Sequence, residues 1–219
     1  TTLFRSVSLQ PGLEDQQLIL NHVKKEQLIQ GMIGFISYPG PLPDEMLPSP
    51  GMAYWFPPPS PSLFSGPTTR LNTLLGLLQK GKLPAKGHPD ITTFVGFPTA
   101  MMMPVLVGLE SEGWSFEKFR TSSVLNLVCR AVEQAMPIVA QKTGGKQPVA
   151  RFLFRPWLLK ILSVIAPKLM PLPIETYLKY HFTKVGDQTR LIVETYESLG
   201  NRFGLPTDAI TELRGLVTR

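Results

Sequence analysis

The hydrophobic pattern of this chain changes its period near residue 90, and this change constrains the fold more than any other feature. Residues 4 to 10 alternate as in a strand, residues 14 to 23 carry apolar side chains at helical spacing, and residues 28 to 38 form an apolar run typical of a buried strand. This order is typical of the trailing part of a parallel α/β sheet. Beyond residue 90 the spacing is helical almost throughout. We therefore expect an α/β domain over residues 1–90 and an all-helical domain over residues 91–219.

Prolines interrupt the first of these domains. Ten of the 22 prolines lie between Pro39 and Pro67, which predicts an extended excursion because proline ends helices and central strands. Residues 52 to 56 have the composition of a short strand within it. A helix is predicted next from Thr68 to Gln79, since leucines recur there at helical spacing.

Three long helices are predicted in the second half. The first covers residues 91 to 109, which carry no charge but include two prolines, so we expect a buried core helix rather than a membrane span. The second runs from residue 116 to about 136, with Ser115 as its N-cap. The third runs from about 174 to 200.

Residues 152 to 174 are rich in Phe, Trp, Leu and Ile and include three basic residues. Such a segment could lie on a membrane surface, pack on a partner subunit or cover the core. We expect burial against the core or against a second subunit of a homodimer, and no membrane association. The apolar set is Phe152, Phe154, Trp157, Leu158, Ile161 and Leu162.

Composition argues against several classes of function. Cys129 is the only cysteine, so no internal disulfide can form, and a reducing compartment such as the cytoplasm is expected. His22, His88 and His181 are too widely spaced for a zinc motif, and no metal cofactor is expected. The formal charge of +6 would attract anions, but no basic stripe interleaved with aromatic residues accompanies it, so nucleic acid is not an expected partner.

Four short motifs keep a characteristic order and spacing along the chain. They are Leu9-Gln10-Pro11-Gly12, Pro89-Asp90-Ile91, the helix that contains Glu133, and Gly204-Leu205-Pro206-Thr207. Together they resemble the ketopantoate reductase family (2-dehydropantoate 2-reductases). The resemblance implies the trailing part of a Rossmann-type sheet, followed by an all-α domain of the 6-phosphogluconate dehydrogenase C-terminal-like type.

The family's cofactor fingerprint, Gly-x-Gly-x-x-Gly, does not occur in this sequence. The resemblance therefore implies a divergent member that lacks the N-terminal dinucleotide-binding segment, with NADPH bound mostly through residues outside this chain. It also implies that Gln10 and Gly12 border the cofactor.

Three positions depart from the family pattern. Pro11 stands where the family has a cofactor-contacting Asn, and Gln188 stands at the position of a substrate-contacting Glu. The family's proton-donating Lys has no equivalent, because no Lys occurs between Lys86 and Lys118. Residues Gly96, Thr99 and Ala100 occupy that region instead.

Without that Lys, other groups would have to donate the proton to the reduced carbonyl oxygen. His181, Lys184 and Gln188 fall at i, i+3 and i+7 on one side of the predicted helix, with Asp187 beside them. A His or Lys tuned by a nearby carboxylate could act as general acid. The alternative is a solvated helix face with an ordinary Lys184–Asp187 pair.

We expect an enzyme, namely an NADPH-dependent oxidoreductase that reduces a 2-oxoacid or a related small carbonyl compound. The alternative is a non-catalytic interaction or assembly module that uses the same scaffold.

Overall fold

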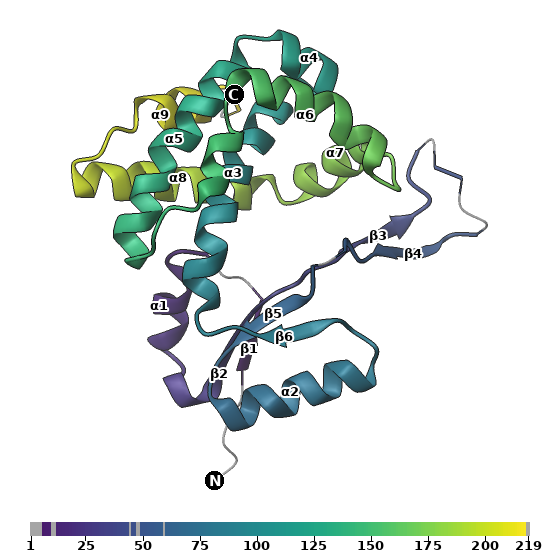
Figure 1. The fold of residues 1–219 in the computed structure, drawn as a ribbon, viewed down its shortest axis with the longest axis vertical. Coiled ribbons are helices and arrows are strands. Elements are labelled where there is room, and N and C mark those ends of the chain that lie inside the picture. The colour runs from purple at the N-terminus through teal and green to yellow at the C-terminus, as the bar shows by residue number, and fades with distance from the viewer. Residues whose placement is uncertain (1–5, 10–11, 44, 47–48, 59, 218–219) are drawn as a thin grey trace. The chain divides into compact units, whose positions relative to one another are not determined.

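The computed structural model describes residues 6–9, 12–43, 45–46, 49–58 and 60–217, and Figure 1 shows the path of the chain. The chain forms two compact units. The first comprises Thr1–Tyr38 and Met52–Gly96, and the second comprises Pro39–Gly51 and Phe97–Arg219. The domain boundary at residue 90 stays a prediction.

The first unit is built on a four-stranded sheet of order β1-β2-β5-β6. Strands β1 and β2 are parallel, as are β5 and β6, while β2 and β5 are antiparallel, so the sheet is mixed. The strands are β1 (Ser6–Ser8), β2 (Leu28–Met32), β5 (Ser62–Ser65) and β6 (Ala85–Gly87). Helices α1 (Asp15–Leu20) and α2 (Thr68–Lys80) and the 3-10 helix η1 (Lys25–Gln27) accompany them.

The predicted strand over residues 28 to 38 is wrong as a single element. It consists of β2 and a separate strand, β3 (Ile36–Gly40), which pairs with β4 (Gly51–Trp55) in a two-stranded sheet. The Pro-rich excursion therefore contains a hairpin. The prediction of α2 is confirmed, and its Leu71 and Leu75 lie over Gly87 of β6.

Helix α3 (Ile91–Ser111) begins directly after Asp90. The Asp90 carboxylate accepts hydrogen bonds from the backbone N–H (3.1 Å) and the hydroxyl (2.6 Å) of Thr93, which satisfies a free donor of the first turn. The helix is long and apolar enough to cross a membrane, yet 61% of its most apolar window is buried inside the structure. That burial supports the expected core helix.

The second unit is helical. Its elements after α3 are α4 (Phe116–Thr121), α5 (Val124–Thr143), the 3-10 helix η2 (Val149–Leu153), α6 (Pro156–Leu169), α7 (Ile174–Lys184), α8 (Gly186–Phe203) and α9 (Asp208–Gly215). Helix α5 packs against α8 and α9, and its buried face supplies much of the core (Figure 1). The fold class predicted from the sequence is confirmed.

Two predicted helices are broken. Ser115 caps its helix as expected, since its hydroxyl accepts from the N–H of Lys118 (3.4 Å). That helix ends at Thr121, however, because Ser122 is extended (φ −81°, ψ 155°), and α5 then starts anew. The helix predicted over 174–200 is likewise interrupted, at Val185 between α7 and α8.

Helix α6 has an unusual orientation. Leu159 and Ser163 are its buried residues, whereas Trp157 is 65% exposed. Phe152, Ile161 and Leu162 are exposed as well. Burial against the chain's own core is therefore wrong for these four side chains.

Candidate functional site

The break at Val185 separates the predicted catalytic residues into two pairs. His181 and Lys184 lie in the last turn of α7, while Asp187 and Gln188 lie in the first turn of α8. They therefore do not share one face of a continuous helix, as the sequence predicted. Their catalytic role stays a prediction.

Aromatic rings surround His181. Its ring stacks on Tyr177 (centroids 5.5 Å apart, 22° between planes) and meets Phe182 edge-on (4.9 Å, 76°). Phe182 in turn stacks on Trp114 at 6.1 Å. Burial lowers the pKa of His181, and the positive charge of Lys184 lowers it further. The imidazole is therefore neutral at neutral pH.

Asp187 does not tune this histidine. It is exposed, and its carboxylate pairs with Arg190, one turn further along α8, at 3.8 Å. Gln188 is also exposed, and its backbone N–H donates to the carbonyl of Val185 (2.9 Å). The structure thus brings together His181 and Lys184, whereas Asp187 pairs with Arg190 instead of forming the Lys184–Asp187 pair that the sequence offered as the alternative.

The sequence did not predict the part-buried ion pair between Arg190 and Glu110. Arg190 Nη2 lies 2.8 Å from Glu110 Oε1, and its Nε–H donates to the carbonyl of Val217 (3.3 Å). One clue was available, because Glu110 is the first charge after the uncharged run of α3. The pair joins α3 to α8 close to the α7–α8 break.

The candidate cofactor turn is described only in part. Gln10 and Pro11 lie outside the described residues. Gly12 is half-buried, and its N–H donates to the carboxylate of Asp15 (3.0 Å) at the start of α1. The backbone donor of Gly12 is therefore bonded within the chain rather than free for a ligand.

The region that corresponds to the family's proton-donating Lys lies in α3. Gly96 and Ala100 are buried there, and Thr99 is half-buried. Helix α3 has no basic side chain to donate a proton.

A cavity of about 370 Å³ lies between α5, η2 and the start of α6. Its charged lining is Arg130, Glu133, Arg151 and Arg155, which makes it net positive. Cys129 also lines it, but burial raises the pKa of this thiol to about 11 although Arg155 opposes that shift, so the sulfur is protonated and not an activated nucleophile. The cavity favours anionic molecules over cations. The arginines are separated in sequence, and only the fold gathers them.

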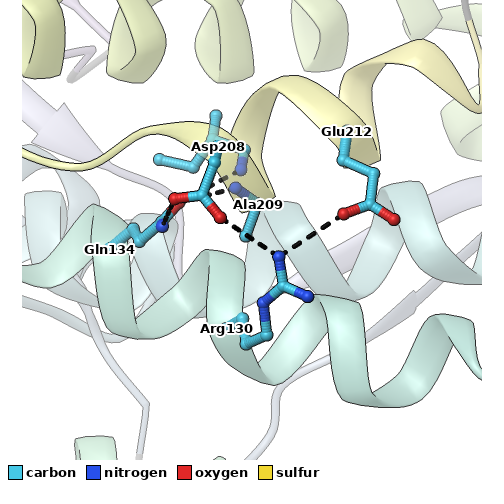
Figure 2. Close-up of polar contacts among 6 residues, drawn as sticks. Arg130, Gln134, Asp208, Ala209 and Glu212 are labelled. Atoms are coloured by element: carbon cyan, nitrogen blue, oxygen red, sulfur yellow. Dashed lines mark hydrogen bonds and ion pairs between the residues drawn. The ribbon is translucent and has the colours of Figure 1, made fainter.

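One of these arginines also has a structural role (Figure 2). Arg130 Nη2 lies 3.1 Å from Asp208 and 3.4 Å from Glu212, both in α9. Beside it, Gln134 Oε1 accepts from the N–H groups of Ala209 (2.9 Å) and Ile210 (3.3 Å), and Gln134 Nε2 donates to Asp208. These contacts attach the start of α9 to α5.

No group of three or more metal-ligating side chains is present in the described part of the chain. The groups of the helical unit that could bind a ligand or transfer a proton are thus the neutral His181 beside Lys184, the Arg190–Glu110 pair and the cationic cavity.

Comparisons with known proteins identify the architecture. A scan against protein-family models and a search of curated proteins both found no match. Among solved structures, a protein from Ralstonia solanacearum MolK2 assigned as a ketopantoate reductase matches at TM-score 0.59 and 15% identity, covering 93% of this chain and 58% of that chain. A protein from Enterococcus faecalis assigned as a 2-dehydropantoate 2-reductase matches at TM-score 0.57 and 13% identity, covering 97% and 65%.

The fold is that of the ketopantoate reductases. A complex of D-mandelate dehydrogenase with NADH shares it, at TM-score 0.55 and 14% identity over 99% of this chain and 70% of that chain. The ketopantoate reductase fold predicted from the four motifs is therefore confirmed, and this chain has the scaffold of a reductase. It spans about three fifths of the length of the two assigned reductases.

Proposed function

We propose that this protein is an NADPH-dependent reductase of a 2-oxoacid or a related small carbonyl compound. The observation that carries the proposal is the match of 93% to 99% of the chain to three oxidoreductases of one fold. Ketopantoate is a 2-oxoacid and mandelate a 2-hydroxy acid, so the names of these proteins point to one class of substrate. We place the activity in the cytoplasm, which agrees with the single free Cys129.

The described residues do not make a cofactor site by themselves. The dinucleotide fingerprint is not in this sequence, and the Gly12 N–H is bonded to Asp15. A bound nicotinamide cofactor would supply hydride to the substrate carbonyl. The residues of this chain are proposed to hold the substrate and to provide a proton.

His181 and Lys184 are the proposed sources of that proton. Because His181 is neutral at neutral pH, it can orient the carbonyl oxygen by a hydrogen bond, but it is rarely the protonated acid. Lys184 carries a positive charge next to it and can donate a proton to a developing alkoxide. Asp187 and Gln188 are proposed as substrate contacts from the first turn of α8.

The test is NADPH oxidation by the full-length protein with a panel of 2-oxoacids. His181→Gln should lower turnover about a hundredfold or more if the imidazole acts in proton transfer, with NADPH affinity nearly unchanged. Lys184→Met should lower it more if the ammonium is the donor. Lys179→Met is the matched control, since Lys179 lies exposed on the same helix.

The proposal fails if the full-length protein does not bind NADPH or NADH. Full activity in both variants would instead leave the reductase proposal in place and show that His181 and Lys184 of α7 do not supply the proton.

A second candidate function is a non-catalytic interaction or assembly module. The exposed apolar residues of η2 and α6 favour it, because a reductase has no catalytic need for them. Micromolar affinity for NADPH would argue against a pure scaffold.

A further inference from the structure

Helix α6 buries Leu159 and the polar Ser163 but turns Trp157 and several Ile, Leu and Val side chains toward solvent. The Ser163 hydroxyl is satisfied internally, since it donates to the carbonyl of Lys160 (2.7 Å). Trp157, Ile161 and Val164 are spaced by four and three residues, so they form one outward stripe. A surface helix of a globular protein ordinarily does the opposite.

The exposed apolar surface extends beyond this stripe. Ile165 and Leu169 continue it along α6, and Leu169 is 75% exposed. Val149, Phe152 and Leu153 of η2 are exposed next to it in the sequence. We call these eight residues the η2–α6 face. Scattered exposed apolar residues need no explanation, but the stripe along α6 is continuous by its helical spacing, and a continuous apolar set marks an interaction surface.

Positive charge accompanies the η2–α6 face. Residues 134 to 174 contain six basic residues and no acidic one. Lys160 and Arg120 of α4 border a shallow groove that is also lined by Ile161 and Val164. The basic residues of the segment are Lys142, Lys146, Arg151, Arg155, Lys160 and Lys168.

We infer that the η2–α6 face docks on an anionic lipid surface. An apolar stripe with Trp at one end and Lys and Arg around it is the composition of a helix that lies in the headgroup region, where the cations meet lipid phosphates. Helix α6 by itself is too short to span a bilayer, because its 14 residues extend about 21 Å. The chain also bends by 100° between α6 and α7.

The competing occupant is a second copy of this chain, the homodimer expected from the sequence. A two-fold contact through the η2–α6 face would bring the same surface of both copies together. Residues 134–174 contribute no acidic residue to oppose their lysines and arginines, and Glu117 of α4 already pairs with Arg120 (3.7 Å), so mostly like charges would meet. An anionic bilayer complements the same charges, and we therefore favour lipid.

Vesicle co-sedimentation of the full chain tests this inference. We expect binding to vesicles of phosphatidylcholine with phosphatidylserine, and little binding to phosphatidylcholine alone. Trp157→Ser should weaken binding roughly tenfold or more, and Lys160→Gln/Lys168→Gln roughly 25-fold, about fivefold for each lysine. Trp157 is mostly exposed, so Trp157→Ser should leave the urea midpoint unchanged.

Matched controls lie on α2 and β6. Leu77→Ser removes an apolar residue of 61% exposure, and Lys80→Gln/Lys86→Gln removes two exposed lysines. Both should bind like the parent. The inference is overturned if the parent does not bind anionic vesicles, or if the control and test variants lose vesicle binding to the same extent. It is also overturned if the parent is a dimer in solution that Trp157→Ser dissociates, because the second copy then occupies the face.

Discussion

His181 lies among aromatic rings rather than beside a carboxylate, and this determines how it responds to pH. Because burial lowers its pKa below the ordinary 6.5, the unfolded chain binds a proton more readily than the folded one. The stability from this group is present above pH 6.5 and is lost as pH falls through 6.5 toward the folded pKa.

We therefore expect the urea midpoint to fall between pH 7.5 and pH 5, and to fall less in His181→Gln. Asp90 and Asp208 also have lowered pKa values, but they start from 3.8 and act below this window. An identical pH dependence in parent and variant would show that His181 does not contribute.

At the residue scale, sequence reasoning succeeded where the chemistry is local. Ser115 caps a helix because its hydroxyl reaches an N–H three residues ahead, which spacing alone reveals. The partner of Asp187 was predicted wrongly, because the break at Val185 ends the helical periodicity on which the prediction depended. The Arg190–Glu110 pair joins residues 80 positions apart, and no periodicity reports such a contact.

At the scale of elements, Gln134 is one of the links between α5 and α9, beside Arg130 (Figure 2). One end of its amide accepts and the other donates, so Gln134→Glu would place a second carboxylate against Asp208. We expect a loss of about 1–3 kcal/mol in the free energy of unfolding, measured by urea denaturation. Gln141→Glu, exposed on the same helix, should change it by less than about 0.5 kcal/mol. Equal effects would contradict this role.

The packing of α3 depends on Gly108. A Cβ there would lie 2.5 Å from Val128 Cγ2 and 2.9 Å from Phe119 Cε2, both in buried residues. We expect Gly108→Ala to destabilise the fold by about 1–3 kcal/mol. Gly76→Ala in α2 meets no atom within 4 Å and should stabilise by about 0.5–1 kcal/mol. Thermal denaturation of both variants distinguishes overpacking from a general effect of alanine.

Periodicity predicted the positions of most elements but not their ends or orientation. Apolar spacing continues across Ser122 and Val185, so it could not show that the chain leaves the helical conformation there. For α6 the pattern shows that two sides differ, but not which side faces the core. The buried Ser163 was therefore not predictable.

At the scale of the whole molecule, the excess of basic over acidic residues falls in one segment of the sequence. The chain has 22 basic and 16 acidic residues, and residues 134–174 contain six of the bases and none of the acids. The remaining residues are balanced. The formal charge of +6 alone does not reveal this segment, because the absence of acidic residues matters as much as the presence of basic ones.

This asymmetry predicts behaviour on a cation exchanger. Lys160→Gln/Lys168→Gln and Lys80→Gln/Lys86→Gln have the same net charge, but only the first pair lies in the basic segment. The first double variant should elute at lower salt than the second, because clustered charges bind an anionic surface together. Co-elution would mean that net charge alone governs retention.

The fold as a whole was predictable from motifs whose order and spacing follow the ketopantoate reductase pattern, and the structural matches agree. The cationic cavity was not predictable, since its arginines come from α5, η2 and the residue before α6. Short motifs report a shared backbone path, whereas a cavity depends on which side chains that path brings together.

The contacts of Gln134 and Arg130 also determine where a protease first finds the chain open. Both side chains hold the start of α9, the C-terminal helix, through hydrogen bonds and exposed ion pairs. In Gln134→Glu this helix should open locally more often, so limited proteolysis should cleave at α9 sooner than in the parent, and peptide mass spectrometry would identify the cleaved segment.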